Sequence, residues 1–189
     1  MQNSRSRRKA GECRGQQAAP RASLTALSKM LAAEPELIQS LLEGGNGPPS
    51  AQADFVLRAA CQAAAARPKN AELHYYAARG AWLAEQLELA EQLLSQALAV
   101  RPRHVPALVL MGKVLHRRRA IERAIACLTS AVSSGAEYPD VYVELGQLWR
   151  QTGDAIRART AFNRALELNP NFKAARDAVA ELATTESGC

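Results

Sequence analysis

The side chains that could bind a metal or act as nucleophiles lie far apart in the sequence. The cysteines are Cys13, Cys61, Cys127 and Cys189, and the histidines are His74, His104 and His116. No C-x-x-C pair occurs, and no two histidines stand three or four residues apart, as a ligand pair on one helix would require. A zinc site needs clustered ligands. The sequence therefore predicts no metal site, no cofactor, and reduced thiols of the kind found in a reducing compartment.

Short catalytic motifs are also missing from the sequence. It contains no G-x-S-x-G, H-E-x-x-H or Walker-type run. Closely spaced glycines occur in 44–50, but without a preceding strand or a following Lys-Ser/Thr they do not predict a phosphate-binding loop. Acidic pairs such as Glu85 and Glu88 are interpreted as solvated helix surface. We therefore expect a protein that is not an enzyme.

Positive charge is concentrated in one part of the chain. The formal net charge is +6. Residues 1–22 carry Arg5, Arg7, Arg8, Lys9, Arg14 and Arg21 against Glu12, which is +5 and leaves about +1 for the remainder. This segment is polar and aperiodic, which predicts a disordered, solubilising tail; contact with a membrane surface or a partner is the alternative.

A second basic cluster, residues 116–119 with Arg123, could support phosphate contacts together with the tail. The tail, however, has no interleaved aromatic residues on which bases could stack. Association with nucleic acid is kept as an alternative function.

The composition favours helices packed through small side chains. Hydrophobic residues make up 48% of the chain but aromatic residues only 5%, and alanines are frequent. No apolar run approaches the roughly 18 residues that span a bilayer. No apolar segment follows the basic N-terminal residues as in a secretory signal. A cytoplasmic location without a membrane span is the expectation.

Helix signals begin after the tail. Ser23 is predicted to cap a helix over 24–31, a second short helix is expected over 35–43, and 44–50 forms a Gly/Pro connector, so that 23–50 is one N-terminal region. A single helix is predicted within 51–70. Beyond it, Pro68, Pro102 and Pro170 fall on a 34-residue grid, which indicates internal repeats.

Three units of 34 residues follow, at 71–104, 105–138 and 139–172. The last unit has Tyr142, Leu145, Gly146, Trp149, Ala158, Phe162, Ala165 and Pro170, and at all eight positions it resembles the tetratricopeptide repeat. The middle unit matches with Leu108, Met111, Gly112, Leu115, Ala124, Leu128 and Ala131, but has Ala136 in place of proline. The first unit keeps Ala78, Ala90, Leu94, Ala97 and Pro102, and departs at His74, Ala77 and Ala81.

The resemblance implies an all-α fold, an α-solenoid in which antiparallel helix pairs form a right-handed superhelix. Close approach of the two helices requires small residues. The expected small contacts are Gly146 with Ala158, Gly112 with Ala124, and Ala78 with Ala90. Residues 173–189 are predicted to be a C-terminal capping helix with a frayed end, with Ala175, Val179 and Leu182 on its apolar face.

In this family the first helix of each unit lines a concave groove. The matching positions predict a partner-binding groove formed by Tyr75, Arg79, Trp82, Val109, Lys113, His116, Arg117, Val143, Gln147 and Arg150. The wider set also includes Glu72, Leu83, Pro106, Asp140 and Gln151. The basic groups outnumber the acids and stand beside two aromatic residues, which favours a peptide with acidic and apolar residues. Where relatives that clamp heat-shock chaperone C-termini need basic groups, this sequence has Asp140 and Glu144, which argues against that client.

The sequence is therefore interpreted as a non-catalytic adaptor or scaffold that binds a protein or peptide partner. Two alternatives belong to other classes: the recognition arm of an enzyme complex, of the glycosyltransferase or sulfotransferase kind, and association with nucleic acid through the basic tail. Self-association through an end helix is also open.

Overall fold

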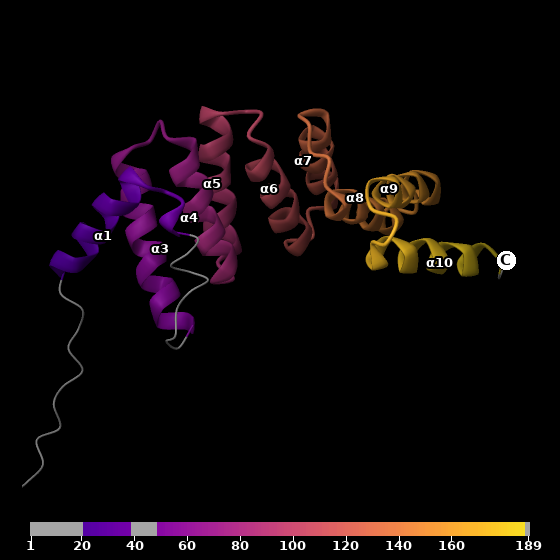
Figure 1. Ribbon diagram of the computed structural model, residues 1–189, viewed down its shortest axis with the longest axis horizontal. Coiled ribbons are helices and arrows are strands. Elements are labelled where there is room, and N and C mark those ends of the chain that lie inside the picture. The colour runs from indigo at the N-terminus through magenta and orange to yellow at the C-terminus, as the bar shows by residue number, and fades with distance from the viewer. Residues whose placement is uncertain (1–20, 39–48, 188–189) are drawn as a thin grey trace, which may run out of the picture.

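The computed structural model describes residues 21–38 and 49–187, and their regular structure is entirely helical (Figure 1). The helices are α1 (Arg21–Ala33), α3 (Pro49–Ala66), α4 (Ala71–Leu83), α5 (Leu87–Val100), α6 (Val105–Arg117), α7 (Ile121–Ser133), α8 (Pro139–Gln151), α9 (Ala155–Leu168) and α10 (Lys173–Ser187). The prediction of an all-α fold is confirmed.

The helices follow one another along a single axis as a chain of hairpins (Figure 1). The strongest packing joins α4 to α5, α6 to α7 and α8 to α9, and weaker contacts join each hairpin to the next. The first helices of consecutive hairpins also touch, since α4 contacts α6 and α6 contacts α8. These three helices therefore line a common face, which we call the inner face.

The N-terminal helices differ from the sequence expectation. Helix α1 begins at Arg21, so Ser23 lies inside the helix instead of capping it; alanine and leucine favour the helical state, which extends it in both directions. Of the helix expected over 35–43, residues 35–36 form a turn and 37–38 are helical, and 39–43 lie outside the described residues. Helix α3 begins at Pro49, inside the predicted connector, because a first-turn proline has no N–H that needs a partner. Residues 1–20 and 44–48 are likewise outside the described part.

Side chains cap three of the helices in the repeats. The Asn70 carboxamide oxygen accepts from the first amides of α4, at 3.1 and 3.3 Å. The His104 Nδ1 atom accepts from the amide of Ala107 in α6, at 3.2 Å. The Asp154 carboxylate accepts from the amide of Arg157 in α9, at 2.9 Å. Each bond satisfies a donor that has no partner within its own helix.

Within the second hairpin and within the third, a glycine allows the two helices to pack closely. A Cβ atom at Gly146 would lie 2.4 Å from the Phe162 ring, and one at Gly112 would lie 2.5 Å from Leu128. The nearest neighbours are therefore these large side chains, and not the alanines Ala158 and Ala124 that the sequence suggested. The alanines are fully buried. A glycine and a large residue interlock because the missing Cβ leaves room for the ring or the branched chain.

The turn inside each hairpin uses a left-handed backbone at the same place. The residues are Glu85 (φ 56°), Arg119 (φ 63°) and Gly153 (φ 81°). Only glycine adopts this conformation without a steric cost. The first two hairpins therefore carry local strain that the third avoids.

The buried apolar residues continue from one hairpin to the next, and helix α10 packs against the last of them. Helix α10 buries Ala175, Ala178 and Leu182 beside Phe162, while Val179 is partly buried. Among residues 21–38 and 49–187, no helix is long and apolar enough to cross a membrane. The described residues also contain no cluster of three potential metal ligands.

Candidate partner-binding groove

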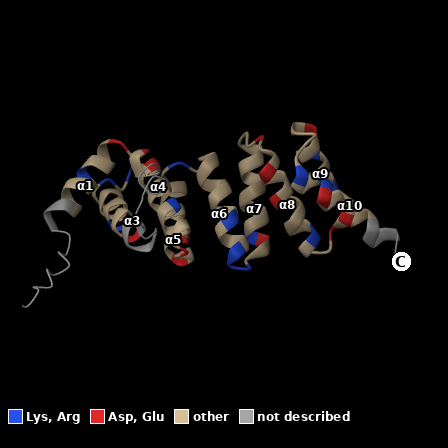
Figure 2. Cartoon of the chain, turned by 60° about the horizontal axis from the view of Figure 1, so that its bottom comes forward, with Lys and Arg blue, Asp and Glu red and all other residues tan. Residues whose placement is uncertain are grey.

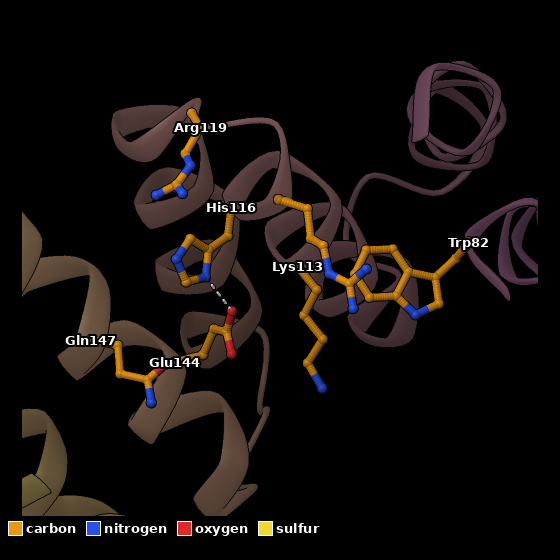
Figure 3. Close-up of a pocket in the computed structure, with 7 residues that line it drawn as sticks. Trp82, Lys113, His116, Arg119, Glu144 and Gln147 are labelled. Carbon is orange, nitrogen blue, oxygen red and sulfur yellow. Dashed lines mark hydrogen bonds and ion pairs between the residues drawn. The ribbon is translucent and has the colours of Figure 1, made fainter. Parts of the chain in front are cut away.

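Two cavities open on the inner face. The central pocket, about 540 Å³, is lined by Trp82, Lys113, His116, Arg117, Arg119, Glu144 and Gln147, so that residues from three hairpins meet in it (Figure 3). The N-terminal pocket, about 370 Å³, is lined by Glu72, Tyr75, Tyr76, Arg79, Arg101, Arg103, His104, Val105 and Pro106. Both volumes are within the range of protein cavities that hold ligands.

One wall of the central pocket is a histidine held between two polar side chains. His116 Nδ1 lies 2.6 Å from Glu144 Oε1 (Figure 3), and its Nε2 lies 3.0 Å from the Gln151 amide nitrogen. The carboxylate can only accept, so Nδ1 donates to it, and Nε2 then accepts from the amide N–H. The ring links α6 to α8 and has its orientation set by both bonds.

The opposite wall combines an aromatic ring with positive charge. The Arg117 guanidinium carbon lies 4.7 Å from the centre of the Trp82 ring, a cation–π arrangement. Arg117 also approaches Glu85 at 3.7 Å. Lys113 lies between this wall and Glu144 in the view of Figure 3, and its Nζ atom is 3.0 Å from Asp140.

Arg119 completes the positive rim of the central pocket. It is exposed, stands on the strained turn between α6 and α7, and has no carboxylate partner within the described residues. The pocket lining thus contains Lys113, Arg117 and Arg119 against the single carboxylate of Glu144. Lys113 and Arg117 are paired with Asp140 and Glu85, so within the described residues Arg119 is the lining cation left to attract an anionic group.

The N-terminal pocket is organised around Glu72. Its carboxylate accepts from His104 Nε2 at 2.9 Å and from Arg101 at 2.8 Å. Burial alone would raise the pKa of Glu72, but the hydrogen bonds from His104 and Arg101 and the positive charge of Arg101 lower it below its ordinary value. The Tyr75 ring makes tilted contacts with the rings of His104 and Tyr76, with centroid distances of 5.3 and 5.2 Å. Burial is the main cause that raises the pKa of Tyr75, so its hydroxyl stays protonated at neutral pH.

The structure divides the predicted groove residues into three groups. The central pocket contains Trp82, Lys113, His116, Arg117 and Gln147, and the N-terminal pocket contains Tyr75 and Arg79. The others, Val109, Val143 and Arg150, line neither pocket.

The C-terminal helix explains two of these three exceptions. Val143 is only 6% exposed and belongs to the core cluster that includes Ala175 and Leu182 of α10. Arg150 forms an ion pair with Glu181 of the same helix. Helix α10 therefore covers the end of the inner face. Val109 packs against the core at the junction of the first two hairpins.

Sequence reasoning did not assign several pocket residues to the groove: Tyr76, Arg101, Arg103, His104 and Arg119. It named Glu144 only as an acid that argues against a chaperone client. Arg101, Arg103 and His104 lie in the loop between α5 and α6, and Arg119 lies in a turn. The positional rule used for the first helices does not reach these connections. The turn at Arg119 could have been found from the third unit, which has Gly153 at the same position, because a glycine there indicates a left-handed backbone.

The basic cluster at residues 116–119 and Arg123 faces acids on the preceding hairpin. Arg118 pairs with Glu91 and lies 3.5 Å from Glu88, and Arg123 lies 2.7 Å from Glu91. Figure 2 shows the Lys and Arg colour gathered at the turn between α6 and α7. These arginines already have carboxylate partners, which reduces what they can offer to phosphates.

The comparisons agree with this architecture. The tetratricopeptide repeat family model matches residues 139–172, and no curated protein sequence matches the chain. Among solved structures, MamA 41-end from Desulfovibrio magneticus RS-1 has a TM-score of 0.73 at 17% identity, covering 85% of this chain and 86% of its own. TTC0263, a thermophilic tetratricopeptide-repeat protein in Thermus thermophilus, has a TM-score of 0.60 at 19% identity, covering 86% and 90%.

A third structure contains a bound peptide. The first tetratricopeptide repeat domain of Spaghetti (RPAP3), bound to the HSP90 peptide SRMEEVD, has a TM-score of 0.60 at 15% identity and covers 64% of this chain and 95% of its own. Identities this low establish the fold alone. The predicted resemblance is confirmed: the chain carries a tetratricopeptide repeat at residues 139–172 and has the fold of tetratricopeptide-repeat proteins.

Proposed function

We propose that this protein is a non-catalytic adaptor that binds a peptide segment of a partner protein on its inner face, with the central pocket as the main contact. The observation that carries the proposal is the composition of that pocket. The Arg117 guanidinium packs on the Trp82 ring, Lys113 lines the same pocket, and Arg119 has no carboxylate partner within the described residues.

The preferred segment has an acidic side chain next to an apolar one. A carboxylate can accept two parallel hydrogen bonds from the Arg119 guanidinium, which is the strongest geometry for this pair. The Trp82 ring, across the pocket from Arg119 (Figure 3), supplies apolar area with little loss of side-chain entropy. Glu144 repels a carboxylate placed on the far side of the pocket, so the segment is expected to bind in one register.

The chaperone peptide bound by the Spaghetti (RPAP3) domain is a partner of that protein. Here the acids Asp140 and Glu144 are engaged by Lys113 and His116 across the inner face. Asp140 reduces the positive charge that Lys113 would offer to a C-terminal carboxylate, and Glu144 repels such a group. We therefore propose an internal acidic segment as the ligand, and not the chaperone C-terminus.

The experiment is a pull-down from native lysate at about 150 mM salt, followed by affinity measurement on the protein that is captured. The test variant is Arg119→Gln with Lys113→Gln. The matched control is Arg176→Gln with Lys173→Gln, which removes two exposed positive charges on α10 from residues that line neither pocket. Hydrogen bonds to charged groups contribute about 1.5–3 kcal/mol, so we expect the test variant to bind at least about tenfold more weakly.

The control variant should retain the affinity of the unmodified protein. Capture of the same proteins, at the same affinity, by the test variant would show that the central pocket is not the binding site. Equal losses in both variants would indicate a general effect of net charge, which would also contradict the proposal.

A further inference from the structure

A third cavity lies away from the inner-face pockets, in the groove between α3 and α5. This outer pocket has a volume of about 480 Å³, and its walls include Ala64, Leu89, Leu93 and Val100. No Lys, Arg, Asp or Glu side chain lines it. It therefore differs in chemistry from the two charged pockets of the inner face.

The outer pocket is lined by two polar side chains, the exposed Gln96 and the buried His74. His74 is 3% exposed, and its Nε2 atom lies 3.1 Å from the carbonyl oxygen of Pro68. A carbonyl oxygen can only accept a hydrogen bond, so Nε2 must carry the proton that is donated to it. Nδ1 of the neutral ring then has a lone pair and acts as an acceptor.

That acceptor has no partner in the part of the chain that the structure describes, although the Nδ1 atom is buried. Buried polar atoms are almost always hydrogen-bonded, because an unsatisfied one loses its interaction with water without compensation. The position is also unusual in its sequence, since the corresponding residues of the second and third units are Leu108 and Tyr142. A histidine here is not required by the packing of the repeat.

We propose that the outer pocket binds a small uncharged molecule with an apolar body and one hydrogen-bond donor, and that a small shift of the His74 ring opens the buried Nδ1 atom so that it accepts from this donor. The volume suits a small organic ligand, and the aliphatic walls favour apolar surface. An ionised ligand would be desolvated with no opposite charge to pair with, which disfavours it. The site is separate from the inner face, so the inference does not depend on the proposed peptide-binding function.

Cys61 provides a reporter, because it lines the outer pocket. Cys127 provides an internal control: it is also a half-buried free thiol, but it does not line this pocket, and burial is the main cause that raises the pKa of both thiols. Alkylation by iodoacetamide, read at each cysteine by peptide mass mapping, measures protection at Cys61 relative to Cys127.

The probes are 4-methylphenol, which carries a hydroxyl donor, and toluene, which has nearly the same shape without one. At equal free concentrations we expect 4-methylphenol to slow alkylation of Cys61 at least threefold while Cys127 is unaffected, and toluene to protect clearly less. In His74→Phe the two probes should protect equally, since the acceptor is gone.

His74→Phe also loses the bond to Pro68 and can fail to fold, so a second variant is needed. Ala99→Trp places a large side chain at an exposed position of the pocket rim. It should fold normally by circular dichroism and show no protection by either probe. Absence of protection in the unmodified protein, equal protection by both probes, or equal protection of Cys61 and Cys127 would each overturn the proposal.

Discussion

Replacing Gly146 by alanine tests the interlocking of the third hairpin. A Cβ atom at this position would lie 2.4, 2.6 and 2.8 Å from three atoms of the Phe162 ring, whereas carbon atoms in contact prefer about 3.5–4.0 Å. Phe162 is fully buried. The ring therefore cannot yield by moving toward solvent, and the helices or the ring must shift.

Two effects of opposite sign decide the magnitude. Alanine in a helix interior is favoured over glycine by about 1 kcal/mol. Overpacking a buried site costs about 1–3 kcal/mol. We expect overpacking to exceed the helix preference, because the overlap is about 1 Å, and Gly146→Ala to lower the free energy of unfolding by about 1 kcal/mol. For a chain of this length that corresponds to a fall in Tm of about 2–4 °C.

The assay is urea unfolding followed by circular dichroism, with Gly146→Ala made in the unmodified protein and in a Phe162→Leu background. Without the ring, the added methyl group should become neutral or stabilising, which gives a coupling energy of about 1–3 kcal/mol. Gly135→Ala is the control: it has a positive φ of 100° and no neighbour within 4 Å. Gly135→Ala should lower the free energy of unfolding by the same amount in both backgrounds. Stabilisation by Gly146→Ala in both backgrounds would refute the proposed steric conflict.

Two further predictions concern the first two hairpins. Glu85→Gly relieves a left-handed residue (φ 56°), and after the entropy cost of glycine it should stabilise the protein by about 0.5–1 kcal/mol in urea unfolding, whereas Glu85→Ala should give no gain. Burial alone would raise the pKa of Glu91, but hydrogen bonds and attraction from Arg123 and Arg118 lower it. The ionised Glu91 carboxylate therefore stabilises the folded protein above its unfolded-state pKa, and this stability is lost as the pH falls through its lower folded-state pKa. Glu91→Gln should lower the free energy of unfolding at pH 7 and make that free energy depend less on pH in the acid range. Parallel curves for the two proteins between pH 7 and pH 3 would contradict this.

Much of the fold could be predicted from the sequence because it depends on local signals. The prolines on a 34-residue grid and the small and large apolar residues at fixed positions predicted helical hairpins, and α4, α6 and α8 begin at Ala71, Val105 and Pro139. Helix propensity, capping and amphipathic spacing act over three or four residues, and the repeat presents the same local signals every 34 residues. The same rule also identified most of the side chains that line the central pocket.

The tertiary structure decided what those side chains contact. His116 is hydrogen-bonded to Glu144, 28 residues away, and Glu91 forms ion pairs with Arg118 and Arg123 of the next hairpin. Helix α10 buries Val143, which removes it from the inner face. Such contacts depend on the rotation between neighbouring hairpins and on the loops that join them. Many small packing and backbone terms set that rotation together, and none of them has a periodic signature in the sequence.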